Sequence, residues 1–166
     1  MNTPIRTALA LALIGASALA QAQSGAVLSE RNVSLALANQ IAAATVAACS
    51  ASGYAVTATV VDRAGNVRAT QRADNAGPHT LEASRLKAYT SASARNTTLA
   101  MMEASQKNPA AANLKDIPGY LLLGGGVPVR AGNEVIGAVG VGGAPGGHLD
   151  EQCAMAALEQ VKAALQ

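Results

Sequence analysis

The sequence has 166 residues, with twelve Lys and Arg against ten Asp and Glu, three Tyr, and neither Phe nor Trp. Half of the residues are apolar and 13% are charged, a composition that excludes disorder over most of the chain. The formal charge of +2 is spread over single residues, and aromatic side chains for stacking on bases are scarce. We therefore expect no nucleic-acid partner.

Residues 1–20 predict a secretory signal peptide. Arg6 precedes an uncharged stretch of apolar and small residues from Ala8 to Ala20, which is the order of an export signal. The stretch is shorter than the roughly 20 residues that cross a bilayer as a helix, and no second run of that kind follows, so we expect no membrane span. Cleavage after Ala20 is favoured, and cleavage after Ala22 is the alternative.

Removal of the signal leaves a short mature N-terminal tail, residues 21–29, and a single domain over residues 30–166. The mature protein is expected to be periplasmic or secreted. Apolar residues recur at steps of three and four from Glu30 to Ser52, which predicts a long helix. Gly53 ends this helix.

Two short runs of strand character follow the first helix. Residues 54–61 are largely β-branched, which is typical of a buried strand, and residues 67–72 alternate in the pattern of a second strand. The turn residues between them, 62–66, predict a hairpin.

The middle of the chain changes to helical character. Pro78 suits the first turn of a helix that covers residues 81–95, where many small residues would let a sheet or a neighbouring helix approach closely. Residues 97–107 predict a second, short helix that ends before Pro109. A loop then leads to a short apolar strand over residues 120–123.

The last third predicts a second hairpin and a final helix. Residues 127–129 and 135–139 flank a turn, and residues 149–165 form a helix with acidic residues at its start and Lys162 near its end, in agreement with the helix dipole. Adjacent strands interrupted by helices predict an α+β domain with a central antiparallel sheet of about five strands flanked by helices.

The two cysteines allow one intramolecular disulfide in an exported protein. Cys49 lies near the end of the first predicted helix and Cys153 near the start of the last, so antiparallel neighbouring helices would bring them together. The bridge would close a loop of about 100 residues, for which chain entropy predicts roughly 4 to 5 kcal/mol of stabilisation. Two buried free thiols are the alternative.

The glycine-rich stretches 124–126 and 140–147 lack the Gly-Lys-Ser/Thr ending of a phosphate loop and the βα context of a dinucleotide fingerprint. We therefore expect no nucleotide cofactor. The glycines allow close approach by a flat ligand or a neighbouring subunit, and plain turns are the alternative. No Gly-x-Ser-x-Gly motif is present, which makes a serine hydrolase improbable.

His79 and His148 are the candidate metal ligands, because each sits where a loop enters a predicted helix. Two histidines cannot supply the three ligands of a catalytic zinc site without help. A single imidazole is sufficient for haem iron, and a Tyr phenolate such as that of Tyr89 can also serve. The alternative is that these side chains bind no ligand and Tyr89 is a packing residue.

Five segments of the chain resemble one known family, the haem-binding GlcG/HbpS family, which includes the C-terminal domain of PduO-type proteins. The order and spacing match over about residues 30–165. The segments are residues 60–66, Ser84 with 87–92, 124–129, 136–144 and 150–154. The resemblance implies a single domain with profilin-like α/β layers around a five-stranded antiparallel sheet, assembly into homo-oligomers, and haem as cofactor.

For the site, we expect one histidine to ligate iron, with His79 as first choice and His148 as runner-up, while a cationic side chain holds a propionate. The candidates for that cation are Lys87, Arg85 and Arg72. The remaining candidate cofactor-binding residues are Tyr89, Gly125 and Gly126.

The leading functional hypothesis is an exported haem-binding protein that captures, buffers or senses haem. An enzyme is the first alternative, acting on haem by oxidative degradation or on a small organic acid. A structural or sensing subunit without a small ligand is the second. Fold resemblance alone does not decide between them.

Overall fold

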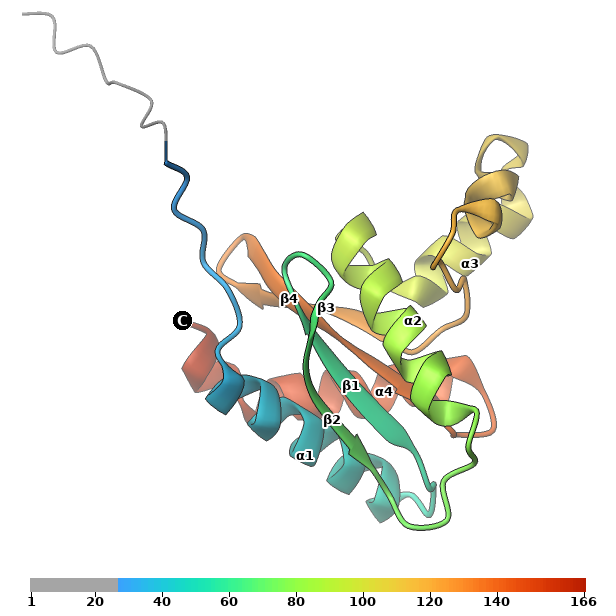
Figure 1. Ribbon diagram of the computed structural model, residues 1–166. Coiled ribbons are helices and arrows are strands. Elements are labelled where there is room, and N and C mark those ends of the chain that lie inside the picture. The colour runs from blue at the N-terminus through green and yellow to red at the C-terminus, as the bar shows by residue number, and fades with distance from the viewer. Residues whose placement is uncertain (1–26) are drawn as a thin grey trace, which may run out of the picture.

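Two hairpins, joined through their inner strands, build one antiparallel sheet with the strand order β2-β1-β4-β3 (Figure 1). The computed structural model describes residues 27–166, so the predicted signal peptide lies outside the described residues. The strands are β1 (Thr57–Asp62), β2 (Val67–Arg72), β3 (Gly126–Ala131) and β4 (Glu134–Gly142). Strands β1 and β4 pair over six residues and are buried almost throughout, whereas the edge strand β2 is largely exposed.

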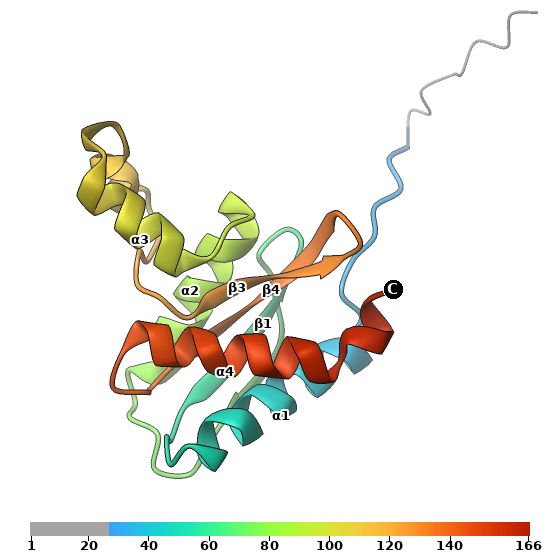
Figure 2. The ribbon, with the colours of Figure 1, turned by 180° about the vertical axis from the view of Figure 1, so that it is seen from behind.

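Helices cover both faces of the sheet. Helices α1 (Leu35–Ala51) and α4 (Gly147–Gln160) pack side by side on one face, and α2 (Thr80–Ala94) lies on the other (Figures 1 and 2). This arrangement confirms the predicted α+β class with an antiparallel sheet flanked by helices. Among residues 27–166, no helix combines the length and apolar character needed to span a membrane.

Small residues bring α2 very close to the sheet, as its composition predicts. A side chain at Gly140 would collide with the backbone of Ser84 and Ala88, so only glycine fits at this point of β4. Two buried hydroxyl pairs add hydrogen bonds between α2 and β1: Thr57 with Thr80 at 2.7 Å and Thr59 with Ser84 at 2.8 Å.

The prediction of a fifth strand over residues 120–123 is wrong, because the sheet has four strands. The backbone amide of Leu121 donates to Thr90 Oγ1 at 2.8 Å, and the hydroxyl of Thr98 donates to the carbonyl of Leu123 at 2.7 Å. Hydroxyl groups on helices therefore satisfy backbone groups that a neighbouring strand would otherwise pair.

The segment before residue 120 stands away from the layers. Helix α3 (Thr98–Lys107) and the 3-10 helix η1 (Pro109–Asp116) project beyond α2 (Figures 1 and 2). Sequence analysis predicts the first of these helices and a loop in place of the second. Asn108 begins η1 by accepting a hydrogen bond from the Ala110 amide through its side chain, and a proline follows at the first helical position.

Both terminal helices are shorter than predicted. Helix α1 begins at Leu35, after Ser34 caps it by accepting a hydrogen bond from the Leu37 amide at 3.2 Å. The residues before it are extended, and Val33 donates to the carbonyl of Ile136 on β4. Helix α4 ends at Gln160, and a short 3-10 helix, η2 (Lys162–Leu165), follows it.

Helices α1 and α4 are linked covalently. Cys49 on α1 and Cys153 on α4 form a disulfide, with their Cα atoms 5.3 Å apart and a sequence separation of 104. Both side chains lie in the main hydrophobic core between the two helices and the sheet. The disulfide therefore joins two neighbouring helices of one layer inside the core rather than two surface loops.

Candidate functional site

A pocket of about 250 Å³ opens where α2 begins and where the glycine-rich loop leads from β4 into α4. The end of β4 and the starts of two helices position its walls. The lining residues are His79, Ala83 and Lys87 of the α2 region, Leu123, the loop residues 142–147, and Asp150 of α4. The loop before α2, which carries His79, and the glycine-rich loop before α4 therefore meet at this end of the sheet.

A buried ion pair forms part of the pocket wall. Lys87 is 1% exposed and Asp150 is 2% exposed. The Lys87 ammonium donates to Asp150 Oδ2 at 2.7 Å and to the carbonyl of Val141 at 2.8 Å. A lysine ammonium has three donors. No other acceptor lies within hydrogen-bonding distance of it among residues 27–166, so the third N–H has no partner in the described residues.

Asp150 also holds the glycine-rich loop in place. Its second carboxylate oxygen accepts a hydrogen bond from the Ala144 amide at 3.0 Å. Burial raises the pKa of Asp150, and the Lys87 charge, the Lys87 hydrogen bond and the Ala144 amide oppose that rise. The carboxylate thus connects α2, the loop and α4 at one point.

Gly125 and Gly126, two of the predicted cofactor-binding residues, do not line the pocket but pack against the residues of the ion pair. Gly125 has a φ of +120°, and a side chain there would lie 2.7 Å from the Asp150 β-carbon. A side chain at Gly126 would collide with the carbonyl of Lys87. The space beside both α-carbons is filled by the chain itself, so these glycines bring β3 close to the ion pair.

Glu151, the residue after Asp150, is a second buried acid. Its side chain is 9% exposed, and its Oε2 atom has no hydrogen-bond partner among residues 27–166. Burial raises the pKa of Glu151, while the Thr97 hydroxyl and the amides of Gly125 and Leu99 oppose the rise. Glu151 does not line the pocket.

Of the two histidines, only His79 lines the pocket. His79 is exposed, occupies the N-cap position of α2 without a capping hydrogen bond, and lines the pocket, with its imidazole lying over Gly77. His148 is exposed in the first turn of α4, over Gly146, and does not line the pocket. The imidazole that can reach a ligand in the pocket is that of His79.

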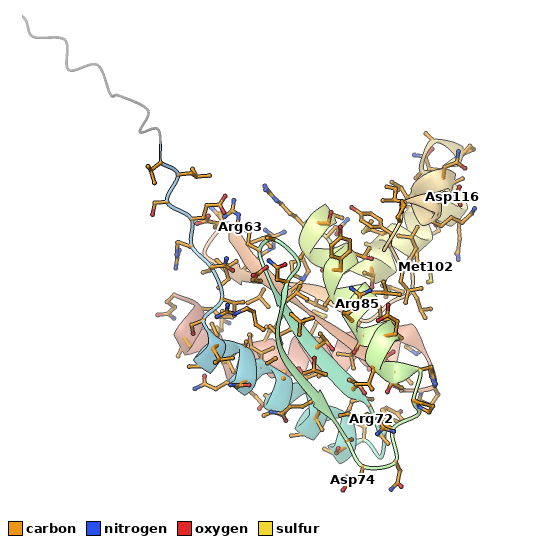
Figure 3. All side chains as sticks on the ribbon, viewed as in Figure 1. Arg63, Arg72, Asp74, Arg85, Met102 and Asp116 are labelled. Atoms are coloured by element: carbon orange, nitrogen blue, oxygen red, sulfur yellow. A yellow bond between two sulfur atoms is a disulfide. The ribbon has the colours of Figure 1, made fainter. Side chains whose placement is uncertain are left out.

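The other candidates have partners away from the pocket. Arg85 donates two hydrogen bonds to Glu82, at 2.7 and 2.8 Å, one turn earlier on α2. Arg72 donates to the carbonyl of Ala76. Figure 3 shows Arg85 on α2 and Arg72 near the end of β2.

Tyr89 lies in a separate aromatic cluster at the edge of α2. Its ring packs over Gly65 and Gly119 and meets Tyr120 edge-on, with 6.4 Å between ring centroids. Neither tyrosine lines the pocket, so the structure gives Tyr89 a packing position.

The part played by Asp150 is not apparent from the sequence, where it is one of the acidic residues at the start of the last predicted helix. The available signal was a lysine in the middle of an Ala- and Ser-rich helix, together with an acid just after the glycine-rich loop. A buried lysine needs an anionic partner. Sequence spacing could not identify that partner, because 63 residues separate the two side chains.

The pocket provides some features that a haem would need. An exposed imidazole without hydrogen bonds in the described residues is a donor suited to haem iron, and Leu123 gives the rim an apolar side chain. The volume is below the roughly 300–1,000 Å³ of sites that bury most of a drug-sized ligand. One subunit can therefore enclose only part of a macrocycle.

Comparisons with known proteins agree with this architecture. The family described as "Haem degrading protein HbpS-like" matches residues 33–159. The crystal structure of HbpS is 38% identical, with a TM-score of 0.78 over 84% of this chain and 97% of that one. An uncharacterized 15.0 kDa protein of Citrobacter freundii, from the dhaT-dhaS intergenic region, is 34% identical over 67% of this chain and 80% of its own length.

A PduOC:heme complex shares the fold at 22% identity, with a TM-score of 0.71 over 77% of this chain and 94% of that one. The fold of this chain is thus shared with a protein whose structure was solved in complex with haem. This chain belongs to the HbpS-like family. The resemblance stated from sequence motifs is confirmed, and membership associates the chain with haem.

Proposed function

We propose that this chain is an exported haem-binding protein in which His79 supplies the iron ligand. The observation that carries the proposal is the exposed imidazole of His79 at the rim of a pocket that also contains the Lys87–Asp150 pair. The third N–H of Lys87 is suited to a carboxylate of the ligand. Bound haem would supply a redox-active iron centre.

Assembly into homo-oligomers is part of the same proposal. The pocket is small and open to solvent, so a second copy of the chain would be needed to cover the rest of a haem. The apolar side chain of Leu123 at the rim is partly exposed and available for such a contact. Export to the periplasm or the cell exterior follows from the signal peptide predicted over residues 1–20.

Oxidative haem degradation is the second candidate, favoured by the description of the family. It requires an oxidant such as peroxide in addition to the protein. The distinguishing measurement is loss of the Soret band with formation of a ring-opened product under peroxide, compared with free haemin at the same concentration. Binding without accelerated loss supports capture or buffering instead.

The binding experiment is a haemin titration of purified protein that lacks residues 1–20, followed in the Soret region. We expect a saturable, red-shifted band in the wild type and in His148→Ala, and its loss in His79→Ala. His148→Ala is the matched control because both imidazoles are exposed and lie over glycines. If all three proteins give only the spectrum of free haemin, haem binding is refuted. If the red-shifted band is lost in His148→Ala alone, the assignment of His79 as the iron ligand is refuted.

A further inference from the structure

A second, larger pocket lies at the opposite end of the sheet. It has a volume of about 650 Å³ and is lined by four arginines together with residues 131–135 at and around the β3–β4 turn, among them Glu134. The arginines are Arg31, Arg63, Arg95 and Arg130. They are four of the seven arginines, and four of the eleven cationic side chains, in residues 27–166.

Four separate segments bring these arginines together. Arg31 comes from the extended N-terminal segment, Arg63 from the β1–β2 turn, Arg95 from the C-terminal end of α2 and Arg130 from β3. Figure 3 shows Arg63 beside the N-terminal segment, far from Arg72 at the other end of β2. The cluster is a product of the tertiary structure.

Nearby carboxylates neutralise only part of this charge. Arg63 pairs with Glu30, at 3.7 Å, and with Glu134. In the described part of the chain, Arg31, Arg95 and Arg130 have no carboxylate partner within 4.0 Å. The pocket therefore has more guanidinium groups than acids.

The backbone contacts of the arginines use few of their donors. Arg31 donates to the carbonyl of Ala131 at 3.3 Å, and Arg130 donates to the carbonyl of Arg95 at 2.9 Å. The second contact places a cation at the C-terminal end of α2, which favours the helix. Each guanidinium has five N–H donors, so most remain available to a ligand.

Arg95 occupies a backbone position that normally favours glycine or asparagine. It is the C-cap of α2 and has a left-handed conformation, with φ 55° and ψ 30°. The carbonyl of this residue accepts the hydrogen bond from Arg130. From this position at the helix end, Arg95 lines the pocket with the other three arginines.

We infer that this pocket binds a small polyanion with carboxylate or phosphate groups. The planar guanidinium fork matches both groups in bidentate geometry. A multivalent anion is required because single contacts between exposed charges contribute little in water. Several guanidiniums around one concave surface can act on the same ligand.

This site is distinct from the haem pocket. The two pockets lie at opposite ends of α2 and of β4. The 15 residues of α2 span about 22 Å at the usual rise, and the nine residues of β4 span about 30 Å. The inference therefore does not depend on the proposed haem site, and the two can fail separately.

The test is isothermal titration calorimetry of the purified protein with citrate and with pyrophosphate, at about 20 mM ionic strength to limit screening. Acetate is the monovalent control. We expect saturable binding of at least one polyanion, weakened about tenfold in Arg130→Gln and in Arg31→Gln, because each substitution removes a charge-assisted contact. Arg68→Gln, at an exposed position on the edge strand β2, should bind like the wild type.

Each outcome decides a specific point. Binding of citrate alone assigns a polycarboxylate, and binding of pyrophosphate alone assigns a phosphate ligand. Retention of binding in His79→Ala shows that the site is independent of the haem pocket. The inference is overturned if neither anion binds at about 1 mM, a concentration that keeps the ionic strength low and exceeds the dissociation constants of ordinary ligands. It is also overturned if Arg68→Gln weakens binding as much as Arg130→Gln and Arg31→Gln do.

Discussion

Replacing Lys87 by methionine should destabilise the protein strongly, although it preserves the length and apolar stem of the side chain. The substitution removes the cation that faces Asp150 at 2.7 Å and leaves a carboxylate that is 2% exposed. The Ala144 amide still donates to Asp150, but it cannot balance a full negative charge. The protein must then protonate Asp150 or admit water to the site.

The expected loss in free energy of unfolding is about 3–5 kcal/mol, the range for breaking a buried ion pair from one side. A typical domain has only about 5–15 kcal/mol of stability, so the variant should unfold at a much lower denaturant concentration. Lys107→Met is the matched control, because the Lys107–Glu103 pair is on the surface of α3 and Lys107 is 75% exposed. It should change stability by less than about 1 kcal/mol.

Urea unfolding followed by far-ultraviolet circular dichroism measures both values. The double variant Lys87→Met/Asp150→Asn should recover most of the loss, because it removes the unpaired charge and keeps an acceptor for the Ala144 amide. A loss below about 1 kcal/mol in Lys87→Met, or no recovery in the double variant, would refute the argument that charge pairing controls stability here.

Three further predictions concern stability. Burial raises the folded-state pKa of Glu151, so the folded protein favours the neutral carboxyl. The contribution of this residue to the free energy of unfolding is therefore fully present below its unfolded pKa of about 4.3 and is lost as pH rises through the folded pKa. Glu151→Gln should therefore be more stable than the wild type at pH 7, by about 1 kcal/mol, and equal to it in acid; equal stability at pH 7 would contradict this. Gly140→Ala should lower the free energy of unfolding by at least about 3 kcal/mol or prevent folding, because the added methyl collides with the backbone of α2. Gly132→Ala is the control: it has open space around it and a φ of +62°, so it should cost only about 1 kcal/mol. Thermal unfolding measures both values. Replacing Cys49 and Cys153 by alanine should lower stability by about 4 kcal/mol in urea unfolding, since the disulfide spans 104 residues; a loss no larger than that of Gly132→Ala would show that the bridge contributes little.

The outcome at residues 120–123 shows why a local pattern can mislead. An apolar run beside glycines is typical of a strand. Here the hydroxyls of Thr90 on α2 and Thr98 on α3 make hydrogen bonds with the backbone of this segment, in place of the bonds that a neighbouring strand would make. Those hydroxyls are 22 to 33 residues away in sequence, so no local pattern reveals them.

The sequence by itself determined the order of helices and hairpins, the α+β class and the family, because periodicity, turn residues and motif spacing are local properties of the chain. It also identified His79 and Lys87 as candidates. Only the tertiary structure decided that Lys87 pairs with Asp150, that His79 reaches the pocket while His148 does not, and that four arginines share a pocket at the far end. These relationships depend on how β4, α2 and α4 pack across the sheet, and packing joins residues whose separation in sequence carries no information about their distance in space.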